Sequence, residues 1–314
     1  MDIVNLFIFS ASIFILMYAG GIMVRPLIWM GRYLRLSEYA VSFILAAFAT
    51  SLPELFVGIN AAFGGTPTLS FGNLIGANVL NVTLVIGVAI YLARGFVSER
   101  TVTKEDAQIA FGLIMFPVFL FLDGMVSRLD GLLLVFLFGG YVIYLIQQDR
   151  REIVVNQMDL KEYRFSNFMK KIAGFSAGTA LLLASSYFVV STGINFAKHF
   201  SLPLFFTGIL IAIGTTLPEV IFSVRSVTLK HGAMSFGNAV GSIVVNISLI
   251  LGIVAIIHPI AVTVPARALI GSLFTAGLLS LIYMLYAAQV KIGRPFGVFL
   301  IMLAFIFILI EAVL

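Results

Sequence analysis

The stretch Ala49-Thr50-Ser51-Leu52-Pro53-Glu54 places a proline, two hydroxyl side chains and a carboxylate inside a long hydrophobic run. A proline in a helix interior removes a backbone donor and clashes with the preceding turn, which frees the carbonyl four residues back, here Ala49. An ionisable side chain at such depth is costly and usually marks the path of a substrate or an ion. The stretch therefore predicts a broken helix that carries a functional carboxylate, Glu54.

The same arrangement occurs a second time, as Gly214-Thr215-Thr216-Leu217-Pro218-Glu219. Each residue of this second stretch lies 165 positions after its counterpart, and Ser70-Phe71-Gly72-Asn73 recurs at the same offset as Ser235-Phe236-Gly237-Asn238. The offset is kept as far as Asn81 and its counterpart Asn246, loops included. A constant offset over such a length indicates an internal duplication.

The composition indicates that most of the chain is surrounded by lipid rather than by water. Of 314 residues, 61% are hydrophobic and 11% charged, and the mean hydropathy is +1.12, whereas soluble domains carry about 25% charged residues. Apolar runs long enough to cross a bilayer, roughly 20 residues each, follow one another along the chain. We expect a polytopic α-helical membrane protein without a cleavable signal peptide, because Asp2 rather than a basic stretch precedes the first run.

Ten spans fit the hydropathy. Outside termini put sixteen of the nineteen Lys and Arg residues on the cytoplasmic side, leaving Arg128, Lys198 and Arg267 outside, in line with the positive-inside rule. The net charge of +5 is thereby explained by basic loops on one side and is no sign of nucleic-acid binding. The predicted spans are 5–29, 40–64, 69–93, 107–123, 129–147, 171–197, 203–228, 234–257, 266–288 and 295–313.

Each half of the chain holds five of these spans. An odd number means that the second copy enters the membrane in the opposite orientation, so the expected fold is all-α, with ten transmembrane helices as two inverted five-helix repeats. Secondary transporters are commonly built this way, with the ion site at the midplane where the repeats meet. The expected division is residues 1–147 with a first motif at 49–81, a cytoplasmic linker at 148–170, and residues 171–314 with a second motif at 214–246.

Glu54 and Glu219 are the two carboxylates that lie well inside the predicted spans. Inverted copies would bring them face to face near the axis that relates the halves. Two desolvated carboxylates repel each other unless a cation lies between them. One divalent ion neutralises both, as would two monovalent ions or two protons, and this equivalence is the chemical basis of exchange.

The other oxygen-bearing side chains of the two motifs suit a hard cation. Calcium takes 6–8 oxygen ligands in adaptable geometry, and a site without cysteine or histidine argues against zinc, copper or iron. The glycines of the two motifs have the GxxxG spacing of close helix packing. The candidate neutral ligands are Thr50, Ser51, Asn81, Thr215, Thr216, Ser242 and Asn246.

At these residues the chain resembles the cation/calcium exchanger superfamily, and within it the sodium/calcium exchanger branch. That family carries G-[ST]-[ST]-x-P-[ED] followed by G-N-x-x-G-[SA]-x-x-x-N, which here reads 49–54 with 72–81 and 214–219 with 237–246. The resemblance covers the whole chain and implies alternating access, in which the first and sixth spans slide across the other eight. It also implies calcium bound by Glu54, Glu219, Thr50 and Thr215.

The resemblance further implies flanking sodium sites, and here the chain departs from the pattern. One site would use the Ala212 carbonyl, Thr215, Glu219 and Ser242, and its mate the Ala47 carbonyl, Thr50, Glu54 and position 77. Position 77 is an alanine where a serine is common, so the second site loses a side-chain ligand. Asn246 stands where potassium-dependent relatives carry an aspartate, which disfavours potassium co-transport. The G-N-x-x-E pattern of the proton/calcium branch is absent, which favours sodium over protons.

The sequence thus predicts an antiporter that exchanges calcium for sodium, with a proton/calcium exchanger as the alternative and a cation channel as a more distant one. An intramembrane enzyme using the two glutamates as an acid/base couple is disfavoured, because no accompanying catalytic motif is found. We expect calcium, a monovalent counter-ion and the lipid bilayer as partners, and no cofactor, nucleic acid or obligate protein partner. The expected location is the cell membrane, with outside termini and a cytoplasmic linker.

Overall fold

The computed structural model describes residues 3–34, 36–94, 104–120, 123–152, 165–199, 204–261, 265–287 and 292–313. Within these ranges the chain is almost entirely helical, and the helices follow the predicted spans in order. Part of the predicted linker, residues 153–164, and the terminal residues 1–2 and 314 lie outside the described residues.

The first half begins with one long helix, continues with two interrupted ones and closes with two further helices. Short π-helical segments, labelled η, lie inside the interrupted helices. The elements are α1 (Ile3–Leu34), α2 (Glu38–Val41), η1 (Ser42–Ala46), α3 (Ala47–Thr50), α4 (Leu52–Phe63), α5 (Pro67–Leu80), η2 (Asn81–Val85), α6 (Ile86–Ala93), α7 (Lys104–Leu120), β1 (Met125–Val126) and α8 (Arg128–Glu152).

The second half repeats this plan. A long helix is followed by a helix that breaks at Thr216, by a helix with an internal π segment and by two final helices. The elements are α9 (Phe165–His199), α10 (Leu204–Thr215), α11 (Leu217–Thr228), α12 (Gly232–Val244), η4 (Val245–Ile250), α13 (Leu251–Ile257), β2 (Ile260–Ala261), α14 (Pro265–Ala287) and α15 (Arg294–Val313).

The prolines explain where the interrupted helices break. Pro53 and Pro218 each lie in the first turn of a new helix, α4 or α11, where a missing backbone N–H does no harm. At Ser51 the chain leaves the helical conformation (φ −83°, ψ 5°), and the helices before and after it are bent by 44°. The predicted broken helix is therefore confirmed, at equivalent places in both halves.

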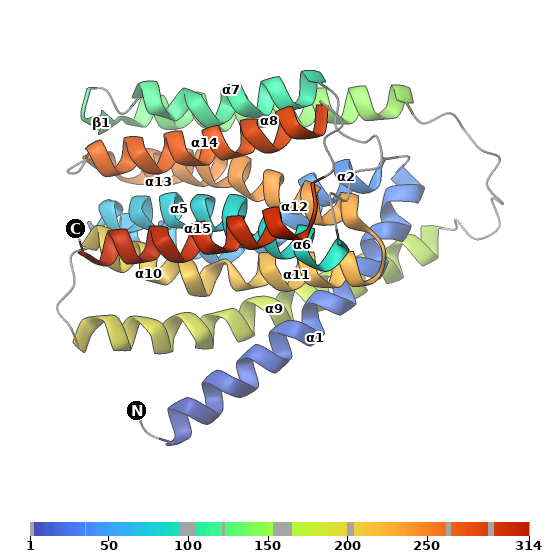
Figure 1. Cartoon of the computed structure of the whole chain (residues 1–314), viewed down its shortest axis with the longest axis horizontal. Coiled ribbons are helices and arrows are strands. Elements are labelled where there is room, and N and C mark those ends of the chain that lie inside the picture. Colours follow the sequence, from blue (N-terminus) through green and yellow to red (C-terminus); the bar gives the residue numbers. More distant parts are fainter. Residues whose placement is uncertain are drawn as a thin grey trace.

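The helices lie side by side in one bundle (Figure 1). The long helices α1 and α9 pack along each other at one side, and α7, α8 and α14 lie at the other. The broken helices and α12 lie between these layers, so the Pro-Glu motifs are inside the bundle. Helix α1 begins and α15 ends at the same end of the molecule (Figure 1).

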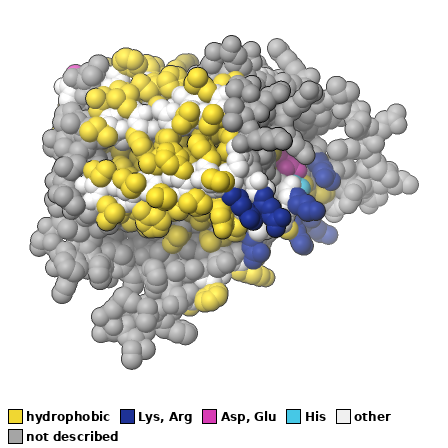
Figure 2. All heavy atoms as spheres, in the orientation of Figure 1, with side chains coloured by type: hydrophobic (Ala, Val, Ile, Leu, Met, Phe, Trp, Pro, Cys, Tyr) yellow, Lys and Arg dark blue, Asp and Glu magenta, His cyan; other side chains and the backbone are white. Residues whose placement is uncertain are grey.

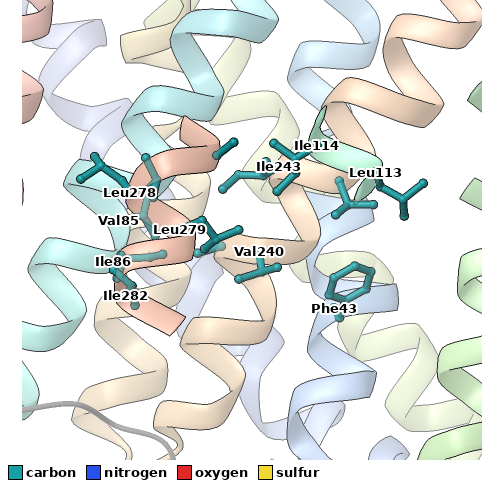
Figure 3. Packing of buried hydrophobic residues seen from close by; sticks show 14 of the residues in the cluster. Phe43, Val85, Ile86, Leu113, Ile114, Val240, Ile243, Leu278, Leu279 and Ile282 are labelled. Carbon is teal, nitrogen blue, oxygen red and sulfur yellow. The ribbon is translucent and has the colours of Figure 1, made fainter. Parts of the chain in front are cut away.

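A hydrophobic cluster holds the interrupted helices against their neighbours. Phe43 of η1 and Val85 of η2 lie with Val240 of α12, Ile114 of α7 and Ile282 of α14, each buried (Figure 3). Where lipid surrounds the helices, close packing of this kind rather than transfer from water drives their association.

The motif glycines lie where helices of the two halves touch. A Cβ on Gly237 would be 2.6 Å from the Tyr39 carbonyl oxygen, and one on Gly241 would be 2.7 Å from that of Phe43. In the other half a Cβ on Gly76 would be 3.0 Å from the Cβ of Ala212. Their predicted role as packing faces is confirmed.

One surface of the molecule is largely apolar, and lysine and arginine side chains gather at one end of it (Figure 2). Large apolar side chains are strongly exposed, and those of Phe136 and Leu129 in α8 are each 77% exposed. Among the described residues, three continuous stretches are long and apolar enough to cross a bilayer, and the pair bent at Ser51 makes a fourth. The three are Pro67–Ala93, Arg128–Gln148 and Gly232–Ile257.

Two features differ from the sequence prediction. Helix α8 continues to Glu152 and α9 starts at Phe165, so both helices extend into the predicted 148–170 linker. Polar residues with good helix propensity continue a helix beyond its apolar part, which hydropathy alone does not register. The two-residue strands β1 and β2 also pair antiparallel, with Val126 opposite Ile260.

Candidate functional site

The site centres on Glu54, in the first turn of α4, and Glu219, in the first turn of α11. Both are 0% exposed, and among the described residues they are the only buried acidic or basic side chains. Ser51, three residues before Glu54, lies 3.4 Å from the Glu219 carboxylate, so the two motifs meet at one place inside the bundle. A helix N-terminus favours a negative charge, which offsets part of the cost of burying each carboxylate.

The two threonines that precede the breaks reach across to the opposite half. Thr50 Oγ1 donates to Asn238 Oδ1 at 3.2 Å, and Thr215 Oγ1 lies 3.3 Å from Asn73 Oδ1. Thr50 also lies 3.5 Å from the Ser242 hydroxyl. These matched contacts join the broken helix of each half to the glycine-motif helix of the other.

Glu219 is held by two hydroxyls. Ser51 Oγ lies 3.4 Å and Ser242 Oγ 3.3 Å from its Oε1 atom, while its Oε2 atom has no hydrogen-bond partner in the described part of the chain. The structure therefore joins Thr50, Ser51, Glu219 and Ser242 in one chain of contacts.

Glu54 has a different environment. Neither of its carboxylate oxygens has a hydrogen bond within the described ranges. The counterpart of Ser242 in this half is Ala77, which is fully buried and offers no hydroxyl. The Thr216 hydroxyl, counterpart of Ser51, also has no partner among described residues. Thr215 lies beside the Glu54 carboxylate, although its hydroxyl bonds Asn73.

The two candidate asparagines begin or enter the π-helical segments. Asn246 Nδ2 donates to Asn78 Oδ1 at 3.1 Å, and the Oδ1 atom of Asn246 has no partner among the residues described. Asn81 is 1% exposed, and neither polar atom of its amide is hydrogen-bonded within the described part. Its amide is therefore not joined by a hydrogen bond to any other predicted site residue that the structure describes.

The two alanine carbonyls already accept hydrogen bonds. Ala47 O accepts from Ser51 N at 3.0 Å and from Thr50 Oγ1 at 3.4 Å. Ala212 O accepts equivalently from Thr216 N at 2.9 Å and from Thr215 Oγ1 at 3.4 Å. Their surroundings match in both halves, as the repeat predicts.

Sequence reasoning missed three residues of this site. Asn73 and Asn238 accept from the candidate threonines, and Asn78 bonds Asn246. The first two carried a signal, because they occupy equal positions in the two motifs. Asn78 carried none, since its counterpart in the second half is Ile243.

The arrangement is an oxygen site enclosed by the bundle. Among the described residues no group of three or more His, Cys, Asp or Glu side chains occurs, so any cation here would rely on two carboxylates with hydroxyl and amide oxygens. Such ligands suit hard cations. Buried acceptors without protein donors normally receive a water molecule or an ion.

Comparison with known proteins agrees with these features. The profile of the family described as sodium/calcium exchanger protein matches residues 4–147 and again residues 170–313. The sodium/calcium exchanger MaX1 of Methanosarcina acetivorans is 27% identical over 82% of this chain and 85% of its own length. The inner membrane protein YrbG of Escherichia coli is 26% identical over 70% of this chain and 69% of its own.

The fold is also that of a solved exchanger. A structure of the sodium-calcium exchanger NCX_Mj superposes with a TM-score of 0.82 at 22% identity and covers 98% of each chain. This likeness shows the fold, a helical membrane fold. The family profile covers nearly the whole chain, in two parts that each contain one Pro-Glu motif. The chain is a multi-pass membrane protein and belongs to the sodium/calcium exchanger protein family.

Proposed function

We propose that this protein is a secondary antiporter that exchanges calcium for sodium across the cell membrane by alternating access. The observation that carries the proposal is the pair Glu54 and Glu219, fully buried, supplied by opposite halves of the chain and linked through the Ser51–Glu219 contact. Such a pair needs positive charge, and calcium or two monovalent ions supply the same amount. Alternating occupancy couples the two fluxes.

The calcium ligands in this proposal are Glu54, Glu219, Thr50 and Thr215. The monovalent ions would use the residues around this centre, and the Ser51–Glu219–Ser242 contacts support a site on the Glu219 side. The amide oxygens of Asn81 and Asn246, which have no hydrogen-bond partner among the described residues, support a place for these two residues as ligands near the carboxylates. The further candidate ligands are Ser51, Thr216, Asn81, Asn246, Ser242 and the carbonyls of Ala47 and Ala212.

We further propose ten membrane spans in two inverted repeats, residues 1–147 and 171–314, with a cytoplasmic linker at 148–170 and outside termini. The family profile matches once in each half. Helix breaks at Ser51 and Thr216 occupy equal positions. The pairing of α1 with α9 (Figure 1) supports these helices as the unit that slides.

The identity of the counter-ion depends on Glu54. Because Ala77 gives its carboxylate no hydroxyl, the sodium site on that side lacks one ligand, and a proton could replace a sodium ion there. A proton needs only the carboxylate oxygen, whereas sodium needs several oxygens. Proton/calcium exchange is therefore the second candidate.

Everted vesicles containing the protein distinguish these candidates. Calcium uptake is measured with an outward sodium gradient, with a pH gradient of equal size and with neither. Sodium-driven uptake supports the first candidate and uptake driven only by the pH gradient the second. Failure of both gradients would reject an exchanger.

The same vesicles test the alternative that the protein is a cation channel. A channel conducts down the calcium gradient without an ion on the opposite side, whereas an exchanger saturates and needs that ion. Calcium efflux from loaded vesicles into a medium free of sodium and protonatable buffer would favour the channel.

A further inference from the structure

Three buried serines at one end of the site lack the hydrogen bond that helix hydroxyls usually make. Thr275, which shows the usual case, donates to the Gly271 carbonyl four residues earlier at 2.9 Å. Ser223, Ser226 and Ser235 are 0%, 0% and 1% exposed, and their hydroxyls have no partner in the described part of the chain.

These serines form a line that begins at Glu219. Helix residues three, four and seven positions apart share a face, so Ser223 and Ser226 follow Glu219 along α11. Helix α12 returns antiparallel after a short turn, and the Ser242–Glu219 contact fixes its register. Moving away from the centre, α11 carries Ser223 and then Ser226, and α12 carries Asn238 and then Ser235, all of them buried.

We call Ser223, Ser226, Ser235 and Asn238 the polar seam. The Nδ2 atom of Asn238 also lacks a partner among the described residues, so each member presents an unpaired polar atom. A buried polar atom left without a hydrogen bond destabilises the folded protein. Four such atoms along one helix pair are costly unless water or a cation reaches them, and a polar site of this kind accommodates water.

The equivalent seam of the first half is built differently. Gly58 and Ala61 replace the two serines of α11. A Cβ on Gly58 would be 3.0 Å from Ser70 Oγ, so these positions, which are equivalent to Ser223 and Ser235, lie next to each other across the helix pair. The same Cβ would be 2.8 Å from Val254 Cγ2, so an apolar side chain closes this seam. The repeat counterpart of Val254 is the smaller Ala89.

The end of the polar seam that is farther from Glu219 reaches the turn between α11 and α12. His231 there pairs with Glu38 of α2 at 2.8 Å, and the Arg225 and Lys230 side chains are exposed. These basic residues belong to the end of the molecule that we assign to the cytoplasm.

We propose that the polar seam is a hydrated route by which cations pass between Glu219 and the cytoplasmic end, and that the first-half seam is not such a route. The proposal rests on the proposed function in taking Glu219 as an ion ligand and the basic end of the bundle as cytoplasmic. It assigns a role to hydroxyls that no step of the exchange otherwise uses.

The absence of cysteine allows a direct test. Single variants Ser223→Cys and Ser226→Cys are treated with a membrane-impermeant cationic methanethiosulfonate, in everted and in right-side-out vesicles. Ala61→Cys, at the position equivalent to Ser226, is the matched control. We expect both serine variants to react at least tenfold faster than the control, and only in everted vesicles.

Equal reaction of all three variants, reaction only from the outer side, or no reaction of either serine variant would overturn the proposal. Labelling does not depend on transport, so wild-type protein without exchange activity would reject the proposed function and leave this result interpretable. Only variants that elute as wild type on size exclusion are scored.

A second measurement addresses function. Ser226→Val replaces the hydroxyl with apolar groups in the part of the polar seam that is farther from the carboxylates. We expect the maximal exchange rate to fall at least fivefold while calcium affinity in calorimetry changes less than twofold. An unchanged rate, or a loss of affinity equal to the loss of rate, contradicts an access role.

Discussion

The two central glutamates differ in their hydroxyl contacts, because Glu219 has two and Glu54 has none among the described residues. Ser242 gives Glu219 a hydroxyl at 3.3 Å, and the equivalent Ala77 gives Glu54 none. A hydrogen bond to a charged group contributes about 1.5–3 kcal/mol. The repeat thus supplies two carboxylates at equal positions, and we expect them to differ in affinity for a small cation.

Ala77→Ser should restore the missing ligand. We expect the sodium concentration that half-saturates exchange to fall about tenfold, because roughly 1.5 kcal/mol is gained at the Glu54 side. Sodium-driven calcium uptake measured over a sodium titration checks this. Ser242→Ala is the matched control and should shift the titration in the opposite direction; no shift in either variant would remove the serine from the sodium site.

Glu54→Gln and Glu219→Gln each keep the side-chain shape and remove one charge. Because a buried charge that loses its partner costs about 3–5 kcal/mol, calcium affinity should fall on the order of a hundredfold or more. Isothermal titration calorimetry on the purified variants measures their calcium affinity. Retained affinity in either variant would argue strongly against shared coordination of calcium.

The central residues of the site were predictable because they are both polar and duplicated. Glu54, Glu219 and the threonines could be identified since a polar side chain that recurs at a fixed offset within apolar runs rarely serves packing alone. The partner of Asn246 could not, because Asn78 lies 168 positions away in sequence and only packing brings the two together.

The crossing of α12 over α2 depends on glycine. A Cβ on Gly237 would be 2.6 Å from the Tyr39 carbonyl oxygen, which is backbone and cannot rotate away. Ser42 Oγ adds a hydrogen bond of 2.7 Å to the Met234 carbonyl at the same crossing. The position of Ser242 and Asn238 at the site follows from this close approach.

Gly237→Ala should therefore force α12 away from α2. Overpacking of this kind costs about 1–3 kcal/mol, so we expect a lower melting temperature in detergent and weaker calcium binding. Gly139→Ala in α8, where a Cβ would meet nothing within 4 Å, is the control. It should leave the melting temperature equal or slightly higher, because alanine is the better helix former. An equal effect of both changes would contradict the packing argument.

Among the elements, the broken helices were predictable because proline has one clear consequence in a helix. The π-helical segments at Asn81–Val85 and Val245–Ile250 were not, since they depend on how neighbouring helices press on the turn. Hydropathy placed the helices but not their polar ends in the linker.

In the whole molecule the charge of the transported ions must balance that of the site. Two carboxylates balance one calcium ion or two monovalent cations, and Ala77 disfavours a third. We therefore expect exchange to move no net charge. Exchange of three sodium ions for one calcium would instead gain about 2.3 kcal/mol per 100 mV.

Calcium uptake with the membrane potential clamped at opposite signs by potassium and valinomycin measures this. The wild-type rate should be the same at both signs. Ala77→Ser, which restores a sodium ligand, should make the rate depend on the sign. A wild-type rate that follows the potential would show that a third cation is carried despite the alanine.

The small β1–β2 ladder limits which parts can move. It connects the loop before α8 to the loop before α14, and so ties one half to the other at a single face of the bundle. Residues opposite each other in such a ladder have Cα atoms about 4.5–5.5 Å apart, a span that a disulfide bridges. Oxidised Met125→Cys/Ala261→Cys protein should thus keep transporting, since the proposed mechanism assigns α8 and α14 to the stationary part.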